Sequence, residues 1–201
     1  LNKKGTKLIW AVPAKNKITV PDSVTSIADN ALKAGKATSV YLGKKVKMIG
    51  KDAIAGKKIT KVSIAKKNKS IAKQGQCVYE KKSGKLLIAI AKKNVVKIGN
   101  KVKLISEDAS LCGSRQLKKL DIGASVKTLQ GAWGEFYRAG YVTTKVYFRS
   151  KNPPKLTQNN DKNYCYLPIF RDVYVPKASL KKYKKWYKKN DALQFARIKT
   201  F

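Results

Sequence analysis

The chain has 201 residues, of which 43% are apolar, and its formal net charge is +35 from 46 basic and 11 acidic residues. The apolar content excludes a wholly disordered protein. No apolar run approaches the roughly 18 residues that a membrane-spanning helix needs, so we expect no membrane span. The first residues lack the apolar stretch of a signal peptide.

The positive charge leaves two interpretations open. An excess of this size attracts polyanions such as nucleic acid, anionic cell-wall polymers or sulfated glycans. However, only five of the 46 basic residues are arginine, whose planar fork suits phosphate and base recognition. Lysines are scattered along nearly the whole chain, which is typical of a solvated surface, and we favour that interpretation.

The cysteines, Cys77, Cys112 and Cys165, form no C-x-x-C pair, and the chain has no histidine to complete a zinc site. We therefore expect no metal ion and no cofactor. Three buried thiols that act as small apolar residues are the favoured interpretation. One disulfide with one remaining thiol is the alternative.

The opening segment, residues 7–12, is similar to residues 85–90, which lie 78 positions later. The similarity continues, because Val20 and Val24 fall on Ile98 and Val102 in the same alignment. The later copy belongs to a predicted hairpin, so the opening resembles the second strand of a hairpin whose first strand is missing. This indicates a piece of a longer parent, or a half-strand that caps one end.

A frame of apolar residues then repeats with a period of 22 residues. Its first two copies are Val20, Val24, Ile27, Ala31, Leu32 and Leu42, Val46, Ile49, Ala53, Ile54. Two-residue spacing at the front of each copy predicts a short strand with one buried face. The later spacing of three and four predicts a turn of helix or a tight bend. One strand and one turn per unit are typical of a leucine-rich-repeat solenoid.

The third unit departs from the frame and carries an insertion. Val62 and Ile64 keep the strand positions, whereas Asn68 stands in an apolar slot. Two strand-like runs flank residues 81–84, which predicts a β-hairpin over residues 76–90. We expect one domain over residues 1–201, with repeats at about 17–37, 38–58, 59–94, 95–117, 118–142 and 143–170, then a strand and capping helix over 171–201. A single unit cannot offset its own ordering entropy, so the units must stack.

The predicted C-terminal helix begins after Ser179, which can act as its N-cap. Its stripe of Leu180, Tyr183 and Tyr187 lies opposite a lysine-rich face. A basic amphipathic helix can bind a membrane or a partner. We favour the alternative that the aromatic stripe closes the solenoid, because the helix follows directly on the last strand.

The first repeat and the ending resemble one known family. Residues 18–32, ITVPDSVTSIADNAL, are similar to the repeat of BspA-like, or Treponema-type, leucine-rich-repeat surface proteins. Departures include glycine for proline at Gly43, Gly99 and Gly123. The resemblance implies a β-rich α/β solenoid: a right-handed superhelix with one short strand plus a helical or irregular turn per repeat, a hairpin insertion and a capping helix. It also implies a bacterial, exported protein that binds host proteins, other cells or matrix.

The sequence contains no catalytic constellation that rises above chance. It has no histidine base, no phosphate-binding loop and no nucleophile elbow. The only adjacent acidic pair, Glu107 and Asp108, precedes the repeat alanine and is expected to serve the local turn. We therefore predict no enzyme activity and no catalytic residues.

The candidate binding surface follows from strand geometry. The apolar residues of each strand point inward, so the middle residues point out. With neighbouring charges they form a predicted sheet face, composed of Lys17, Thr19, Tyr41, Ser63, Lys97, Lys119, Asp121, Lys145, Tyr147, Arg149 and Tyr174. Solenoids commonly bind through such a face; the alternative is that tyrosine merely suits an exposed strand.

We therefore expect a non-enzymatic surface or secreted binding module, extracellular or attached to the cell surface, with its signal peptide removed. Its partner would be a host or cell-surface protein or glycan, and a monomer is expected. Two alternatives stay open: an electrostatic polyanion binder, and a structural spacer of a larger surface protein.

Overall fold

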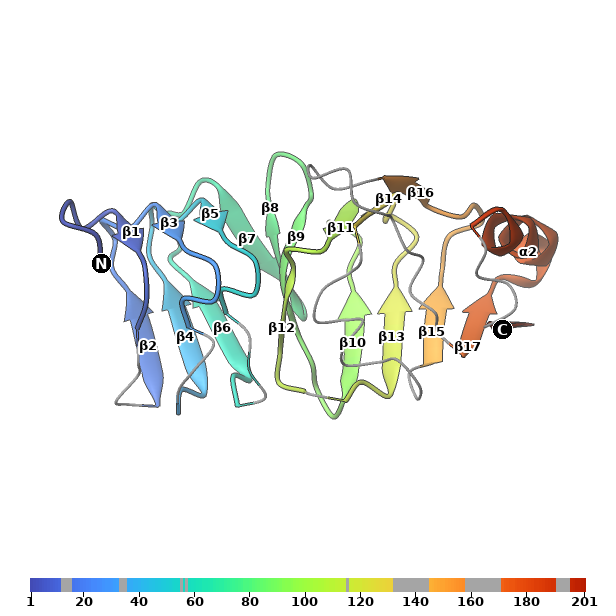
Figure 1. The fold of residues 1–201 in the computed structure, drawn as a ribbon, viewed down its shortest axis with the longest axis horizontal. Coiled ribbons are helices and arrows are strands. Elements are labelled where there is room, and N and C mark those ends of the chain that lie inside the picture. Colours follow the sequence, from blue (N-terminus) through green and yellow to red (C-terminus); the bar gives the residue numbers. More distant parts are fainter. Residues whose placement is uncertain are drawn as a thin grey trace.

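The computed structural model describes residues 1–11, 16–32, 36–54, 56, 58–114, 116–131, 145–157, 171–190 and 196–201. These residues form a β-solenoid that extends from the N-terminal to the C-terminal end (Figure 1). The first set of stacked strands is β2 (Lys17–Val20), β4 (Ser39–Leu42) and β6 (Lys61–Ile64). The second set is β10 (Val95–Ile98), β13 (Lys119–Ile122), β15 (Lys145–Phe148), β17 (Asp172–Val175) and β18 (Arg197–Thr200). The predicted solenoid is thus confirmed.

The register of these strands follows the repeat frame. Val20, Leu42 and Ile64 are direct partners across three parallel strands. Within β4, Val40 and Leu42 are buried while Tyr41 between them is half-buried. A slip of one residue would turn the apolar set toward solvent, so burial of one face fixes the register.

The later part of each frame forms a tight turn and then a second short strand. The Val24 amide donates to the Pro21 carbonyl at 3.1 Å, which closes the turn. The second strands are β1 (Lys7–Leu8), β3 (Ser26–Ile27), β5 (Met48–Ile49), β11 (Leu104–Ser106), β14 (Thr128–Gln130) and β16 (Lys155–Thr157). Of the two alternatives, the tight bend is therefore observed. The second strand, which the spacing did not predict, forms because neighbouring layers accept its hydrogen bonds: the Gly50 amide donates to Ile27 at 2.9 Å.

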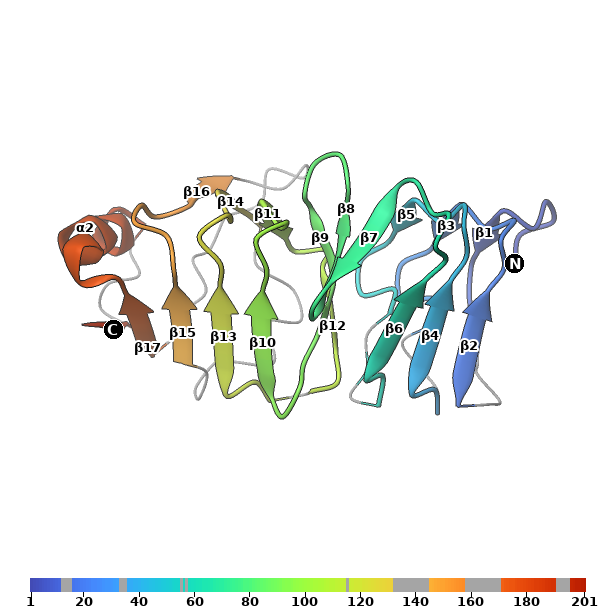
Figure 2. The same cartoon turned by 180° about the vertical axis from the view of Figure 1, so that it is seen from behind.

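An antiparallel insertion lies between the two sets of stacked strands. It comprises β7 (Ile71–Gln74), β8 (Cys77–Glu80) and β9 (Leu86–Ile90), and β12 (Ser110–Cys112) pairs parallel with β9. Figure 2 shows these strands in the middle of the array. The predicted hairpin is present, and it is extended by β7, which begins five residues before the predicted start.

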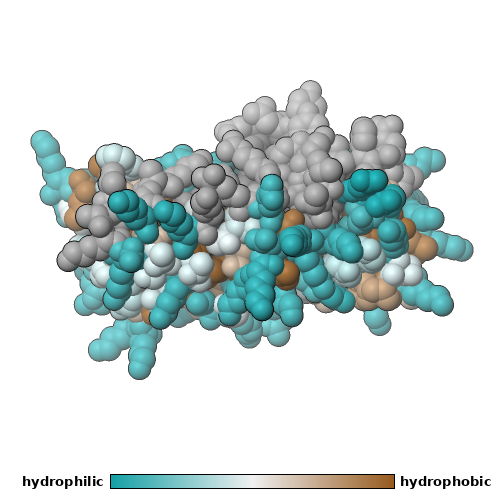
Figure 3. All heavy atoms as spheres, turned by 90° about the horizontal axis from the view of Figure 1, so that it is seen from below, coloured by the Kyte–Doolittle hydropathy of each residue, from teal (hydrophilic) through white to brown (hydrophobic). Residues whose placement is uncertain are grey.

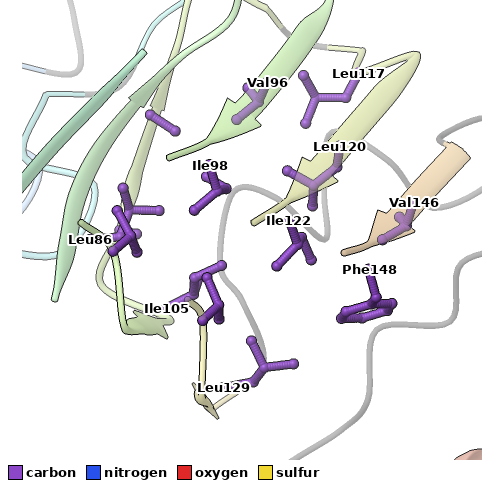
Figure 4. Close-up of a cluster of buried hydrophobic side chains, with 14 of the residues drawn as sticks. Leu86, Val96, Ile98, Ile105, Leu117, Leu120, Ile122, Leu129, Val146 and Phe148 are labelled. Carbon is purple, nitrogen blue, oxygen red and sulfur yellow. The ribbon is translucent and has the colours of Figure 1, made fainter. Parts of the chain in front are cut away.

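The core consists of two clusters of buried apolar side chains. One includes Val20, Leu42 and Val62, and the other includes Leu120, Ile122 and Val146. Figure 4 shows side chains of β10, β13 and β15 pointing into an interior that they share with Ile105 of β11 and Leu129 of β14. Strand β9 contributes to both clusters, so the insertion links the two halves of the core.

The structure describes two of the three cysteines that we predicted to be buried thiols. Cys77 and Cys112 are both buried, and the Cys112 thiol donates to the Ile54 carbonyl at 2.6 Å. Burial raises the pKa of the Cys77 thiol to about 11, so it is protonated at neutral pH. Cys165 lies outside the described residues.

Two departures from the repeat frame have a packing reason. A Cβ atom at Gly43 would lie 2.6 Å from the Pro21 carbonyl oxygen, and one at Gly123 would lie 2.6 Å from that of Ile98. Glycine therefore lets successive turns stack closely at these steps.

Asn68, which stands in an apolar slot of the frame, is only 3% exposed. Its amide nitrogen donates to the carbonyls of Gly43 and of Val46, both at 2.9 Å, so it connects two layers.

The C-terminal end is closed by a helix, as predicted. A 3-10 turn, η1 (Lys177–Ser179), leads into α2 (Leu180–Lys189). Tyr183 and Tyr187 are fully buried, and the Tyr183 ring lies 5.4 Å from that of Phe148. The predicted side-chain cap is wrong: Ser179 is buried within the 3-10 turn and makes no capping hydrogen bond. In the part of the chain that the structure describes, no helix is long and apolar enough to cross a membrane.

Candidate binding surface

The structure divides the predicted binding face between two sheets. Lys17, Thr19, Tyr41 and Ser63 lie on the N-terminal sheet, which is formed by β2, β4 and β6. The other predicted residues lie on or directly after strands of the C-terminal sheet, which is formed by β10, β13, β15, β17 and β18. The antiparallel insertion separates the two sheets (Figures 1 and 2). Our prediction of one continuous face is therefore wrong, because the predicted residues are divided between two sheets.

The C-terminal sheet presents two outward rows of side chains. One row runs Lys97, Asp121, Tyr147, Tyr174 and Lys199, and the other runs Lys119, Lys145, Asp172 and Arg197. Each row places side chains of successive strands beside one another, because parallel strands in register align equivalent residues. The sheet therefore brings together residues that lie up to about a hundred positions apart in sequence.

Four residues of this surface were missed by the sequence prediction: Asp172, Arg197, Lys199 and Phe201. The last three were missed because β18 was not predicted; it pairs parallel with β17 beyond the helix. The signal was short but present, since charged side chains at 197 and 199 flank Ile198 with the same alternation as earlier strands. Asp172 stands where lysine occupies the two preceding strands, so the row pattern did not suggest it.

An aromatic stack forms the middle of this surface. The rings of Tyr147 and Tyr174 are parallel within 8°, with centroids 4.5 Å apart. Phe201 lies 6.1 Å from the Tyr147 ring and is 49% exposed. Such pairs stabilise one another by about 0.5–1.5 kcal/mol beyond area burial. The register of β15 and β17 holds both tyrosines, so the stack is fixed by the backbone.

Cationic groups surround the stack. The Lys119 ammonium lies 4.1 Å from the Tyr147 ring centroid. The Arg149 guanidinium lies 5.2 Å from the same centroid and 4.5 Å from that of Phe201. These distances allow cation–π attraction. Aromatic and cationic groups therefore share one patch, which we call the tyrosine–arginine patch (Lys119, Asp121, Tyr147, Arg149, Asp172, Tyr174, Arg197, Lys199 and Phe201).

Two carboxylates hold the cations in place. Arg149 donates two hydrogen bonds of 2.7 Å to Asp121, and Arg197 donates bonds of 3.0 and 2.8 Å to Asp172. Partial burial opposes ionisation of Asp121, but Arg149 and Lys119 outweigh it and lower its pKa. Hydrogen bonding from Arg197 lowers the pKa of Asp172. Both carboxylates are ionised at neutral pH, so the patch is pre-organised.

The N-terminal sheet lacks such a patch. Its outward row is Thr19, Tyr41 and Ser63, and among the described residues Tyr41 stacks on no other ring. A hollow of about 640 Å³ adjoins Tyr41 and is lined by Asp22, Lys44 and Ile64, among others. The Lys44 ammonium lies 3.4 Å from the Asp22 carboxylate, with both side chains about half exposed.

Comparison with known families identifies the repeat. The family model described as BspA type Leucine rich repeat region matches residues 14–133, with six copies of the repeat. The matched segment is more than half of the chain. The chain belongs to this family. Neither a curated protein nor a solved structure matches it.

Membership of the BspA-type family supports three broad statements. The repeat suggests a protein-interaction module, the family is typically non-enzymatic, and its members are typically surface-attached or secreted. Across the described residues, no group of three or more metal-binding side chains comes together. The chemistry available on the tyrosine–arginine patch is that of recognition: flat aromatic faces, fixed hydrogen-bond donors and two carboxylates.

Proposed function

We propose that this BspA-type chain is a non-enzymatic binding module, displayed outside a bacterial cell, that engages a protein or glycan partner through the tyrosine–arginine patch. The observation that carries the proposal is the stack of Tyr147 on Tyr174 beside the clamped guanidinium of Arg149. Tyrosine and arginine are, together with tryptophan, the residue types enriched at binding hot spots. The C-terminal sheet gathers both, whereas the N-terminal sheet carries neither an aromatic pair nor an arginine.

Pre-organisation strengthens this proposal. Binding requires side chains to lose conformational freedom, which costs about 0.5–1.5 kcal/mol for each flexible one. Here the Arg149 side chain is already held by two bonds to Asp121, and Tyr147 is held by its neighbouring rings. A partner that contacts these groups therefore meets a surface with little left to order. Flat rings suit both a protein side chain and a sugar ring.

The test is an array of proteins and glycans probed with the purified chain at two ionic strengths. We expect saturable binding to a defined ligand that persists at physiological salt. A Tyr147→Ala/Tyr174→Ala chain should lose at least about tenfold in affinity, as expected when two hot-spot side chains are truncated. The matched control, Thr19→Ala/Tyr41→Ala, removes outward residues of the N-terminal sheet and should bind normally. Equal loss in both variants, or no saturable ligand, would overturn the proposal.

A second candidate function rests on charge. The net charge is +35, and Figure 3 shows hydrophilic side chains along the whole length of one face. This distribution supports attraction to a polyanion without a defined site. Such binding weakens steeply as salt rises, because bound counterions are released. Binding that vanishes at physiological salt and is indifferent to the two tyrosines would favour this second function over the first.

A further inference from the structure

The second row of strands is interrupted at the third unit. Strands β1, β3 and β5 form one sheet, and among the described residues no strand continues this sheet beyond β5. The repeat frame places Ser70 and Ile71 22 residues after Met48 and Ile49 of β5, where the next strand of the sheet would lie. Instead, the amides of Ser70 and Ile71 both donate to the side-chain oxygen of Asn68, at 2.9 Å. Ile71 begins β7, which pairs with β8, so the chain leaves the second row at this step.

A hollow of about 450 Å³ lies where the chain leaves the second row. It is lined by β5 and its preceding turn on one side and by the insertion on the other, and Figures 1 and 2 show these elements next to each other. The volume falls within the roughly 300–1,000 Å³ of small-molecule sites. Met48, which is 56% exposed, is the one apolar side chain among the described residues that line the hollow. The Ser70 side chain adds a hydroxyl group.

Positive charge dominates the lining of this hollow. Four lysine side chains from three segments surround it: Lys47, Lys69, Lys81 and Lys82. The only carboxylate in the described lining is that of Glu80, which accepts a hydrogen bond from the Ser83 hydroxyl in the hairpin turn. Four ammoniums and one carboxylate give the hollow a local net charge of +3. Such a concentration of one sign attracts an anion.

The four lysines differ in whether they have a partner. The Lys81 ammonium donates to the Asn68 carbonyl at 2.7 Å, so it is held in place. Within the described part of the chain, Lys47, Lys69 and Lys82 form no ion pair with a carboxylate. Like charges around one hollow repel one another, and a bound anion would relieve that repulsion. Three ammoniums are therefore available to a ligand.

We propose that this hollow, which we call the lysine hollow (Lys47, Met48, Lys69, Ser70, Glu80, Lys81 and Lys82), binds a sulfated or phosphorylated sugar. The sulfate or phosphate group lies among the ammoniums, and the sugar ring lies against Met48. A tetrahedral oxyanion accepts charge-assisted hydrogen bonds from several directions, which matches lysines that come from three segments. The volume is many times the roughly 30 Å³ that a water molecule occupies, so a free ion would leave most of the hollow unfilled. A lining of ammonium and hydroxyl groups with one apolar side chain suits a hydroxylated ring.

The lysine hollow is independent of the proposed function. It lies beside β5 and the insertion, whereas the tyrosine–arginine patch is built on β13, β15, β17 and β18. It also differs from the second candidate function, which attracts a polyanion without a defined site. A ligand held by the lysine hollow should therefore respond to particular lysines and not to the net charge of the chain.

The test uses Met48 as a reporter, because it is the only methionine in the chain. Labelling the methionine methyl group with carbon-13 gives one methyl NMR signal, which comes from the lysine hollow. Glucose 6-sulfate and glucose 6-phosphate are titrated at constant, physiological ionic strength, with glucose and inorganic sulfate as controls. We expect both charged sugars to move the signal saturably with a Kd on the order of millimolar, since exposed ion pairs are individually weak. Glucose and inorganic sulfate should each bind at least about tenfold more weakly.

Two variants of equal net charge separate a defined site from bulk attraction. Lys69→Gln/Lys82→Gln removes two ammoniums of the lysine hollow and should raise the Kd for both charged sugars by at least about tenfold. The matched control, Lys181→Gln/Lys185→Gln, removes two exposed lysines of α2 and should leave the Kd unchanged. A Tyr147→Ala/Tyr174→Ala chain should also keep the Met48 shift, so this site can stand or fall separately from the tyrosine–arginine patch.

Four outcomes would overturn the proposal. The first is a Met48 signal that neither charged sugar moves saturably, and the second is an equal loss of affinity in the two lysine variants. The third is inorganic sulfate that binds as tightly as the charged sugars, which would reduce the site to one for a free ion. The fourth is a short phosphoserine peptide that binds more tightly than either sugar, which would assign the lysine hollow to a phosphorylated protein.

Discussion

The N-terminal and C-terminal sheets share one construction and differ in what they present to solvent. In both, strands stack in parallel with Val40 and Leu120, for example, pointing into the core. Outward, the N-terminal sheet offers Thr19, Tyr41 and Ser63, whereas the C-terminal sheet offers the tyrosine–arginine patch. Stacking constrains only the inward residues, so the outward residues are free to differ. We therefore expect recognition to depend on the outward residues that distinguish the two sheets.

The largest expected effect is on the packed core, which both sheets share. Leu42→Ala and Ile122→Ala remove buried side chains at matching strand positions, which are 0% and 1% exposed. Each should lower the free energy of unfolding by about 2–5 kcal/mol, through lost burial and the cavity left behind. Denaturant titration of both variants measures this. A loss below about 1 kcal/mol in either sheet would mean that its layers are not packed as described.

The shared construction is also the part that the sequence predicts well. The identical spacing of Val20, Val24 and Ile27 in successive units requires one register, and the structure has it. A second strand such as β3 is harder to predict, because its hydrogen bonds go to other layers and leave little periodicity in two residues. Asn68 likewise looks like a defect in sequence, since its amide nitrogen donates to two carbonyls of a neighbouring turn that sequence spacing does not reveal.

The binding surface was predictable only in part. Period-two alternation identified Tyr147 and Tyr174 as outward residues on separate strands, but their stacking depends on the register of β15 against β17. Arg197, Lys199 and Phe201 reach the patch because the chain returns to the sheet after α2. The only local signal for that return is the short alternation of Arg197, Ile198 and Lys199. The division of the predicted binding face between two sheets was not predicted. The sequence indicates the hairpin, but it does not show that the hairpin lies between the stacked strands and interrupts the sheet.

The second effect addresses what distinguishes the two sheets. A double-mutant cycle with Tyr147→Ala and Tyr174→Ala should give a coupling of about 0.5–1.5 kcal/mol in unfolding free energy, because the rings stack at 4.5 Å. The matched cycle with Tyr41→Ala and Ser63→Ala should give a coupling near zero. Couplings of equal size would remove the contrast between the sheets.

A smaller effect concerns the clamped arginine. Arg149→Lys keeps the charge but removes the paired hydrogen bonds to Asp121, and it should lower the free energy of unfolding by about 0.2–1 kcal/mol. The counterpart beside the N-terminal sheet, Lys44→Ala in the turn after β4, breaks a half-exposed pair with Asp22 and should change stability by less. Thermal melts of both variants check this. A larger loss at Lys44 would reverse the ranking.

The smallest effect is a pH dependence. The pKa values of Asp121 and Asp172 are lowered in the folded chain, so the unfolded chain binds more protons between the folded and unfolded values. Their stabilising contribution is therefore present above the ordinary pKa of about 3.9 and is lost as pH falls through the lowered values. Unfolding free energies measured from pH 7 to pH 2 should fall less steeply for an Asp121→Asn/Asp172→Asn chain. An unchanged slope would mean that the cations do not act on these carboxylates.

The most direct test of the central claim, that recognition occurs on the C-terminal sheet, is a hydrogen-exchange footprint. The chain is bound to the ligand selected by the array, and amide exchange is compared with that of the free chain. We predict slower exchange concentrated on β15, β17 and β18, with β2, β4 and β6 unchanged. Protection centred on the N-terminal sheet, or spread evenly along the solenoid, would contradict the account.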